Sequence, residues 1–140
     1  MAEFPEDSII PQAGVIRKHI ELYRPSNGDL ITEAPVQFVY SSILSTLGTV
    51  IQKSAWMPWF GGPLYCNLFT LLIGESTSTK KTTCIRACQK YLIDMCVADP
   101  KISTFLFPSA GSPEGIFELL SQRSKGIFVF SEFSTLTDLL

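Results

Sequence analysis

The strongest hydrophobic periodicity in the chain begins after Pro35 and continues to Ile51. Apolar residues recur there at intervals of three and four positions, and the positions between them carry mainly Ser, Thr and Gln. This spacing predicts an amphipathic helix of about four turns, with Pro35 at its start. Because the polar face is uncharged, we expect it to pack against another layer of the protein instead of being fully solvated.

Beyond the long helix and the linker that follows it, apolar runs alternate with helical patterns. The runs are short enough for strands buried on both faces, and they lie at 68–73, 102–107 and 127–130. Two helices are predicted between them, one over 83–97 and one from Pro113, with Ser112 as its cap, to near Ser124. The order strand, helix, strand, helix, strand predicts an α/β fold with a parallel sheet and covering helices.

Three regions follow from these patterns. Residues 1–34 read as an irregular lead-in, punctuated by Pro and Gly, with a short helix expected around 14–22. Residues 35–66 combine the long helix with an aromatic linker at 56–63, and we expect this region to pack on the core. Residues 67–140 contain the alternating pattern and form the predicted α/β domain.

The aromatic linker allows two interpretations. Trp56, Trp59 and Phe60 lie close together among prolines and glycines, which favours a hydrophobic plug beneath the preceding helix. Stacking of the Trp side chains on nucleic-acid bases is the alternative. The segment lacks the interleaved Lys and Arg that are typical of single-strand binders, so we expect the plug.

Composition excludes several classes of protein. The chain has 140 residues, of which 46% are hydrophobic and 17% charged, as in one packed domain or a piece of one. Eleven Lys and Arg against thirteen Asp and Glu give a net charge of −2, so no global basic field draws the chain to nucleic acid. The acidic N-terminus is unlike a signal peptide, and no apolar run approaches the about 20 residues of a membrane span. These features predict a cytoplasmic protein with no membrane partner.

The cysteines indicate neither a zinc site nor a disulfide framework. Cys66, Cys84, Cys88 and Cys96 include no CxxC pair, and His19 is the one histidine of the chain. Cys84 and Cys88 share a helix face, but further ligands are not evident. We therefore expect reduced and mostly buried cysteines.

The candidate functional site is the polar loop between the first predicted strand and the following helix. Its residues are Gly74, Glu75, Ser76, Thr77, Ser78, Thr79, Lys80, Lys81, Thr82 and Thr83. A phosphate-binding loop needs this context, because its backbone amides and the helix N-terminus surround the phosphates. Lys81 would then reach the outer phosphates of ATP, and Thr82 would coordinate Mg²⁺.

The match to the standard pattern GxxxxGK[ST] is incomplete. Lys81 follows Gly74 by seven positions instead of six, and Lys80 occupies the position of the second glycine. A Ser- and Thr-rich loop that only caps a helix is the alternative interpretation.

A second element supports the nucleotide site. The predicted strand 127–130 is followed by Ser131 and Glu132. An ATPase with a phosphate loop needs an acid at the end of a neighbouring strand, which holds Mg²⁺ or activates the attacking water. Glu132 is the candidate for activating water, and Ser131 stands where an Asp that organises Mg²⁺ is expected, so it would act on Mg²⁺ through water. The alternative is that Glu132 is a surface or helix-capping acid.

From about Pro35 to Leu140 the chain resembles a family of primase- and helicase-associated P-loop ATPases of unknown function, encoded on plasmids, phages and integrated elements. The resemblance rests on a strand start, the basic loop, a helix start and an acid-Phe pair, in this order. In this sequence they are Asn67-Leu68-Phe69, Gly74-Glu75-Ser76 with Lys80-Lys81-Thr82-Thr83, Ser112-Pro113-Glu114-Gly115 and Ser131-Glu132-Phe133. The extra residue and the missing glycine belong to this loop variant. Thr82 and Ser131 depart from the small residue and the Asp that are common in the family.

The resemblance implies a RecA-like core that binds and hydrolyses ATP, coupled to DNA unwinding or replication initiation. It also implies a homo-oligomeric ring, since an arginine finger usually comes from a neighbouring subunit. The strand that carries the γ-phosphate sensor would follow Leu140, so we expect the chain to be the N-terminal part of a longer protein, with an open slot between two strands.

Two other functions remain as alternatives. The missing glycine and Ser131 are compatible with a non-catalytic nucleotide-binding or interaction module that keeps a degenerate loop. A small-molecule phosphotransferase of the nucleotide-kinase type is the weaker alternative, because it needs an arginine-rich lid that this chain hardly supplies.

Overall fold

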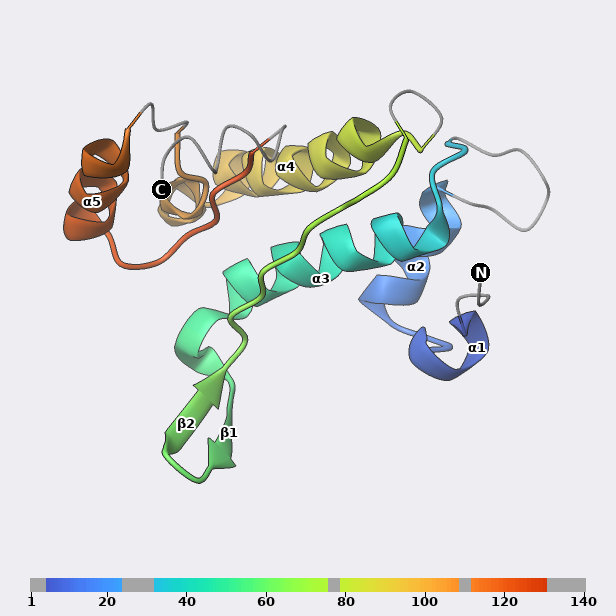
Figure 1. Cartoon of the computed structure of the whole chain (residues 1–140), viewed down its shortest axis with the longest axis horizontal. Coiled ribbons are helices and arrows are strands. Elements are labelled where there is room, and N and C mark those ends of the chain that lie inside the picture. Colours follow the sequence, from blue (N-terminus) through green and yellow to red (C-terminus); the bar gives the residue numbers. More distant parts are fainter. Residues whose placement is uncertain (1–4, 24–31, 76–78, 109–111, 131–140) are drawn as a thin grey trace. The chain divides into compact units, whose positions relative to one another are not determined.

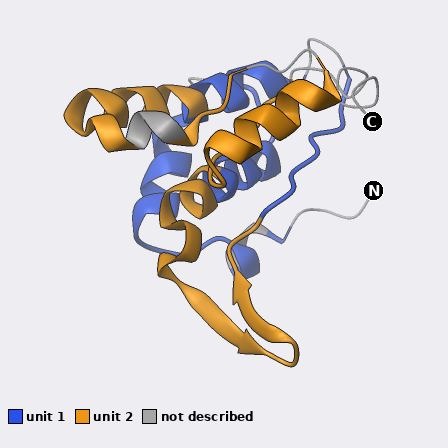
Figure 2. Ribbon diagram, turned by 90° about the vertical axis from the view of Figure 1, so that its left-hand side faces the viewer, with its two compact units in different colours: residues 1–45, 68–88 blue, residues 46–67, 89–140 orange. Residues whose placement is uncertain are grey.

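The computed structural model describes residues 5–23, 32–75, 79–108 and 112–130 (Figure 1). Its elements in chain order are α1 (Glu6–Ile9), α2 (Val15–Tyr23), α3 (Val36–Ile51), η1 (Gln52–Ser54), β1 (Trp56–Trp59), β2 (Gly62–Tyr65), α4 (Lys81–Ala98), η2 (Pro100–Phe105) and α5 (Pro113–Gln122). The chain divides into two compact units (Figure 2). Unit 1 comprises residues 1–45 and 68–88, and unit 2 comprises residues 46–67 and 89–140.

The helices follow the sequence pattern closely. The helices predicted at 14–22, 36–51, 83–97 and from Pro113 are confirmed as α2, α3, α4 and α5. Asp99 follows the last residue of α4, and its side chain accepts a hydrogen bond from Lys101 N at 3.0 Å, which starts η2. Ser112 caps α5 by accepting from Gly115 N at 3.2 Å. Local hydrogen bonds therefore set these boundaries without help from distant residues.

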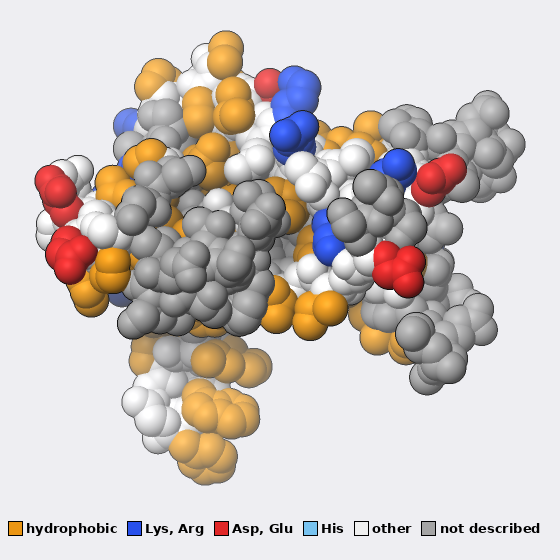
Figure 3. Space-filling view, turned by 45° about the horizontal axis from the view of Figure 1, so that its top comes forward, with side chains coloured by type: hydrophobic (Ala, Val, Ile, Leu, Met, Phe, Trp, Pro, Cys, Tyr) orange, Lys and Arg blue, Asp and Glu red, His pale blue; other side chains and the backbone are white. Residues whose placement is uncertain are grey.

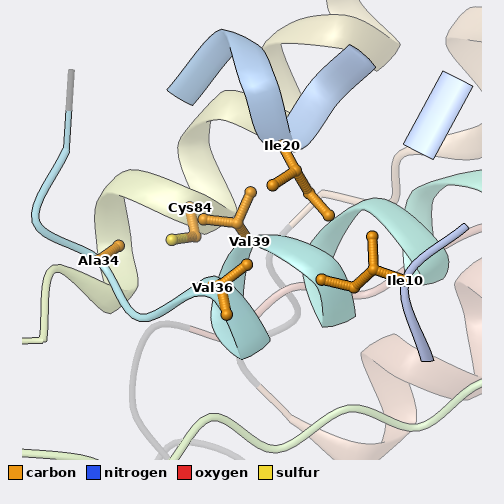
Figure 4. Packing of buried hydrophobic residues seen from close by; sticks show 6 residues of the cluster. All are labelled: Ile10, Ile20, Ala34, Val36, Val39 and Cys84. Carbon is orange, nitrogen blue, oxygen red and sulfur yellow. The ribbon is translucent and has the colours of Figure 1, made fainter. Parts of the chain in front are cut away.

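Unit 1 has a small hydrophobic core that α2, α3 and the start of α4 share (Figure 4). Its buried members are Ile10, Ile20, Ala34, Val36, Val39 and Cys84. The side chains of Ile16, Tyr23, Phe38 and Tyr40 pack against this cluster and are partly buried. Burial of apolar area is the main stabilising contribution here, at about 25 cal/mol per Å².

The uncharged face of α3 is buried in part, as its composition suggests. Ser42 and Thr46 expose 7% and 5% of their surface. The hydroxyls of Ser41 and Ser45 donate to the carbonyl oxygens one turn earlier in the same helix, at 2.7 and 3.0 Å. Such bonds satisfy a hydroxyl within its own helix, so the face can pack without charged partners.

The aromatic linker folds into a hairpin, and its predicted role as a buried plug is wrong. β1 and β2 pair antiparallel from Trp56 opposite Tyr65 to Trp59 opposite Gly62. Trp56 and Trp59 are each 61% exposed, and Phe60 in the turn is fully exposed. Hydrophobic side chains therefore gather on the surface of the hairpin (bottom of Figure 3).

Unit 2 contains a stack of three aromatic rings. The rings of Phe107 and Phe128 are parallel with centroids 4.3 Å apart, and Phe130 continues the stack at 6.3 Å from Phe128. The guanidinium of Arg123 lies 4.6 Å from the Phe107 ring centre, at cation–π distance. Beside the stack, Leu106 and Ile127 form a parallel bridge.

The predicted parallel α/β sheet, and with it the partial RecA-like core, is wrong. Within the described ranges the sheet is the two-stranded antiparallel β1–β2 pair, and parallel pairing is limited to the bridge of Leu106 with Ile127. The segment 68–73 is extended but unpaired (Figure 1), and most of the predicted strand 102–107 lies in η2. An apolar run becomes a strand only when another segment supplies the ladder of hydrogen bonds, and the sequence pattern does not encode that partner.

No helix in the described part of the chain is both long enough and apolar enough to cross a bilayer.

The bridge beside the aromatic stack depends on the absence of a side chain at Gly126. A Cβ there would lie 2.5 Å from Phe107 Cε2 and 2.6 Å from the Phe105 carbonyl oxygen. We expect Gly126→Ala to lower the free energy of unfolding by about 1–3 kcal/mol, because the backbone must move to accept the methyl group. Gly61→Ala is the matched control, since a Cβ at Gly61 meets nothing within 4 Å. Urea unfolding of both variants is the measurement, and equal midpoints would contradict this packing.

Burial of His19 makes the stability depend on pH. The ring is 6% exposed and lies 4.9 Å from the Tyr23 ring, and burial lowers the pKa of His19 below its ordinary value. The unfolded chain therefore takes up a proton near pH 6.5 that the folded chain does not bind. We expect the free energy of unfolding to fall as the pH decreases from about 7.5 to about 5.5. In His19→Gln this slope is lost, and a slope unchanged by the substitution would assign it to other groups.

Candidate phosphate-binding site

The loop predicted to bind phosphate, residues 74–83, begins at the end of the extended segment 66–75 and ends in the first turn of α4, whose first residue is Lys81 (Figure 1). Lys81 is partly buried, and its Nζ donates a hydrogen bond to the carbonyl oxygen of Gly74. The two ends of the loop are therefore held together by the side chain that the sequence assigns to the phosphates. The ammonium group lies at the mouth of the loop instead of extending into solvent.

A second contact inside the loop brings Thr79 back to its beginning. Thr79 Oγ1 donates to the carbonyl oxygen of Glu75 at 2.8 Å. A Cβ at Gly74 would lie 2.9 Å from both Cγ2 and Oγ1 of Thr79. Gly74 is therefore required for close packing, which is a physical reason for the glycine that opens the motif.

Lys80 has a left-handed backbone, with φ of 46°. This is the position at which the standard phosphate-loop pattern has its second glycine. Left-handed φ values are natural for glycine and cost about 1–2 kcal/mol for most other residues. The backbone at Lys80 therefore has a conformation better suited to glycine than to lysine. The Lys80 side chain is exposed.

The first turn of α4 places two threonine hydroxyls beside this loop. The carbonyl oxygen of Lys80 accepts hydrogen bonds from the amides of Thr83 and Cys84, at 3.0 and 3.4 Å. The side chains of Thr82 and Thr83 are exposed, and the first turn has no acidic residue. The partial positive charge at the start of this 18-residue helix is therefore not compensated by a carboxylate within the turn.

The structure thus brings together the described loop residues, which are Gly74, Glu75, Thr79, Lys80, Lys81, Thr82 and Thr83. The proposed amide donors Ser76, Thr77 and Ser78 lie outside the described residues. The same holds for Ser131 and Glu132, so their roles in Mg²⁺ binding and in activating water stay predictions. The Thr79 contact and the left-handed backbone of Lys80 were not predicted from the sequence. For Lys80 there was a signal, because it stands where the standard pattern has its second glycine.

The cysteines near the site behave as core residues. Burial, reinforced by the neighbouring Cys88, raises the pKa of Cys84 to about 11. Both thiols are buried, which confirms that part of the prediction, whereas Cys66 is exposed. A protonated thiol is a poor metal ligand. Among the residues that the structure describes, no three His, Cys, Asp or Glu side chains are grouped as metal ligands.

Comparison of the chain with protein-family models, curated proteins and solved structures finds no match. Membership of the primase- and helicase-associated family therefore stays a prediction, supported only by the ordered motifs in the sequence.

The left-handed backbone at Lys80 has a measurable consequence. We expect Lys80→Gly to raise the free energy of unfolding by about 0.5–1 kcal/mol, because relief of the left-handed penalty exceeds the greater entropy of glycine in the unfolded chain. Lys90→Gly, in the exposed middle of α4, is the matched control and should lower it by about 1 kcal/mol. Thermal unfolding separates the two variants, and the same sign for both would rule out the left-handed conformation.

Proposed function

We propose that residues 74–83 bind the phosphate groups of ATP together with Mg²⁺. The observation that carries the proposal is the contact of Lys81 Nζ with the Gly74 carbonyl oxygen, which holds an ammonium group at the mouth of a closed loop. A phosphate oxygen is a stronger acceptor for an ammonium than a neutral carbonyl is. In the proposal, the Lys81 ammonium therefore exchanges the Gly74 carbonyl oxygen for a phosphate oxygen when ATP binds.

Other parts of the loop also contribute to binding in this proposal. The amides at the start of α4 and the helix dipole favour a bound anion. The exposed hydroxyl of Thr82 serves as a ligand for the Mg²⁺ that accompanies the triphosphate. The amides of 76–79 complete the cradle in the proposal, and Lys80 adds a phosphate contact or stays in solvent.

Hydrolysis is the second part of the proposal and depends on Glu132. In this mechanism Glu132 orients the attacking water in line with the γ-phosphate, and Ser131 holds a water molecule of the Mg²⁺ shell. The resemblance to the primase- and helicase-associated family supports this part, together with its extension to DNA unwinding by a ring of subunits. The motif order in the sequence is the only support for DNA and for the ring.

A nucleotide-binding module without hydrolysis is the second candidate function. The observed fold favours it, because within the described residues no parallel sheet links residue 130 to the loop. Phosphate binding by the loop does not need such a sheet. Hydrolysis does need Glu132 close to the loop, because Glu132 must orient the water that attacks the γ-phosphate.

Binding is tested by titrating the protein with a fluorescent ATP analogue in the presence of Mg²⁺. We expect Lys81→Ala to weaken the affinity by about tenfold or more, since a charge-assisted hydrogen bond contributes about 1.5–3 kcal/mol. The control is Lys90→Ala, which removes an exposed lysine of α4 that pairs with Asp94 at 2.7 Å. Equal affinities of wild type and Lys81→Ala would refute phosphate binding by this loop.

Hydrolysis by the longer protein that the resemblance implies separates the two functions. Glu132→Gln retains binding in both cases, because the substitution leaves the loop intact. If the wild-type protein hydrolyses ATP at least ten times faster than this variant, the ATPase is supported. If the two rates are equal while Lys81→Ala has lost binding, the protein is a nucleotide-binding module.

A further inference from the structure

The segment 68–73 combines three properties that rarely occur together on a protein surface. It is extended (Figure 1), and within the described part of the chain its backbone makes no hydrogen bond to another segment. Leu68, Phe69, Leu71 and Ile73 are all exposed. The surrounding stretch from Ser54 to Gly74 contains no charged residue. A strand of this kind is a template for pairing, because it lacks the charges and prolines that usually block strand addition.

The two faces of this segment differ. On one face Thr70 Oγ1 lies 2.6 Å from Ser45 Oγ of α3, so this face is turned toward α3. Residues of a strand alternate between faces, so Phe69, Leu71 and Ile73 share the other face. These three side chains are 101%, 57% and 78% exposed. The segment therefore offers both an unpaired backbone and a continuous apolar face.

We propose that residues 68–73 pair antiparallel with the same residues of a second copy of this chain, about a two-fold axis at Leu71. This register places Leu71 opposite Leu71 and Phe69 opposite Ile73. Directly opposite residues lie on the same face of an antiparallel pair, so only a register of this parity joins the exposed faces. The two-fold axis closes the assembly as a dimer, because each copy uses the same surface.

The other strands of the chain are poorer partners. Pro58 and Pro63 lie opposite each other in the hairpin and supply no N–H groups, so the hairpin edges are poorly suited to accept a further strand. The backbone groups of Ile127 are already engaged at the bridge, because its amide donates to the Phe105 carbonyl oxygen and its carbonyl oxygen accepts from the Phe107 amide. A second copy of 68–73, in contrast, is apolar, uncharged and free of proline, so it brings neither repulsion nor missing donors.

The association is tested by sedimentation equilibrium over a range of protein concentrations. We expect wild type to shift from the monomer mass to twice that mass as the concentration increases, and Leu71→Lys to stay monomeric because two ammonium groups would meet at the axis. Val97→Lys is the matched control, since Val97 is an exposed apolar residue of α4, and it should associate as wild type does. Circular dichroism shows whether each variant keeps its helices. A wild type that is monomeric at every concentration overturns the proposal.

Cross-linking then tests the register. In a Cys66→Ser background, with diamide as the oxidant of the two thiols, Leu71→Cys should form a disulfide-linked dimer in high yield. Thr70→Cys should not, because residue 70 lies opposite residue 72. Efficient cross-linking of both variants indicates parallel or disordered association and overturns the antiparallel register, and cross-linking of neither overturns the pairing.

Discussion

The contact between the Lys81 ammonium and the Gly74 carbonyl oxygen is the interaction on which the candidate site depends. It joins the end of an extended segment to the first residue of a long helix, so the loop between them begins and ends at the same point. Gly74 also packs closely on Thr79, and Lys80 has a left-handed backbone. Because the two ends of the loop are already held close together, less entropy would be lost if an anion bound between them.

A long stretch without charge shapes the rest of the molecule. From Ser54 to Gly74 the chain passes through the hairpin and the extended segment without an acidic or basic side chain. Such a composition normally belongs to a core, yet many of its large side chains are exposed here, including Trp56, Trp59, Phe60 and Phe69. In this structure the burial of apolar surface is instead concentrated on α2, α3 and the start of α4.

Two residues with strained backbone lie near the uncharged stretch, one before it and one after it. Gln52 and Lys80 are the non-glycine residues with positive φ in the described part of the chain, at 50° and 46°. Gln52 also has a buried amide nitrogen without a hydrogen-bond partner. Residues held in such conformations cost free energy, and they persist where the surrounding structure imposes them. Lys80 directly precedes the first residue of α4, so its left-handed backbone lies where the chain enters that helix.

Local signals in the sequence are enough to predict the helices. Periodic apolar positions, Pro113 and the Ser112 cap act within a few residues of where they stand, so α2, α3, α4 and α5 are predicted correctly. The motif from Gly74 to Thr83 is also visible in the sequence, and its role in binding phosphate stays a prediction.

Tertiary contacts, in contrast, determine which apolar runs become strands and which side chains are buried. The run 68–73 looks the same in sequence whether it lies inside a sheet or at a surface, so its exposure is not visible in the sequence. The prediction of a plug at 56–63 is wrong because aromatic content indicates burial on average, and the average does not hold for each segment. Strand pairing joins residues far apart in the chain, so its outcome depends on partners that local pattern does not specify.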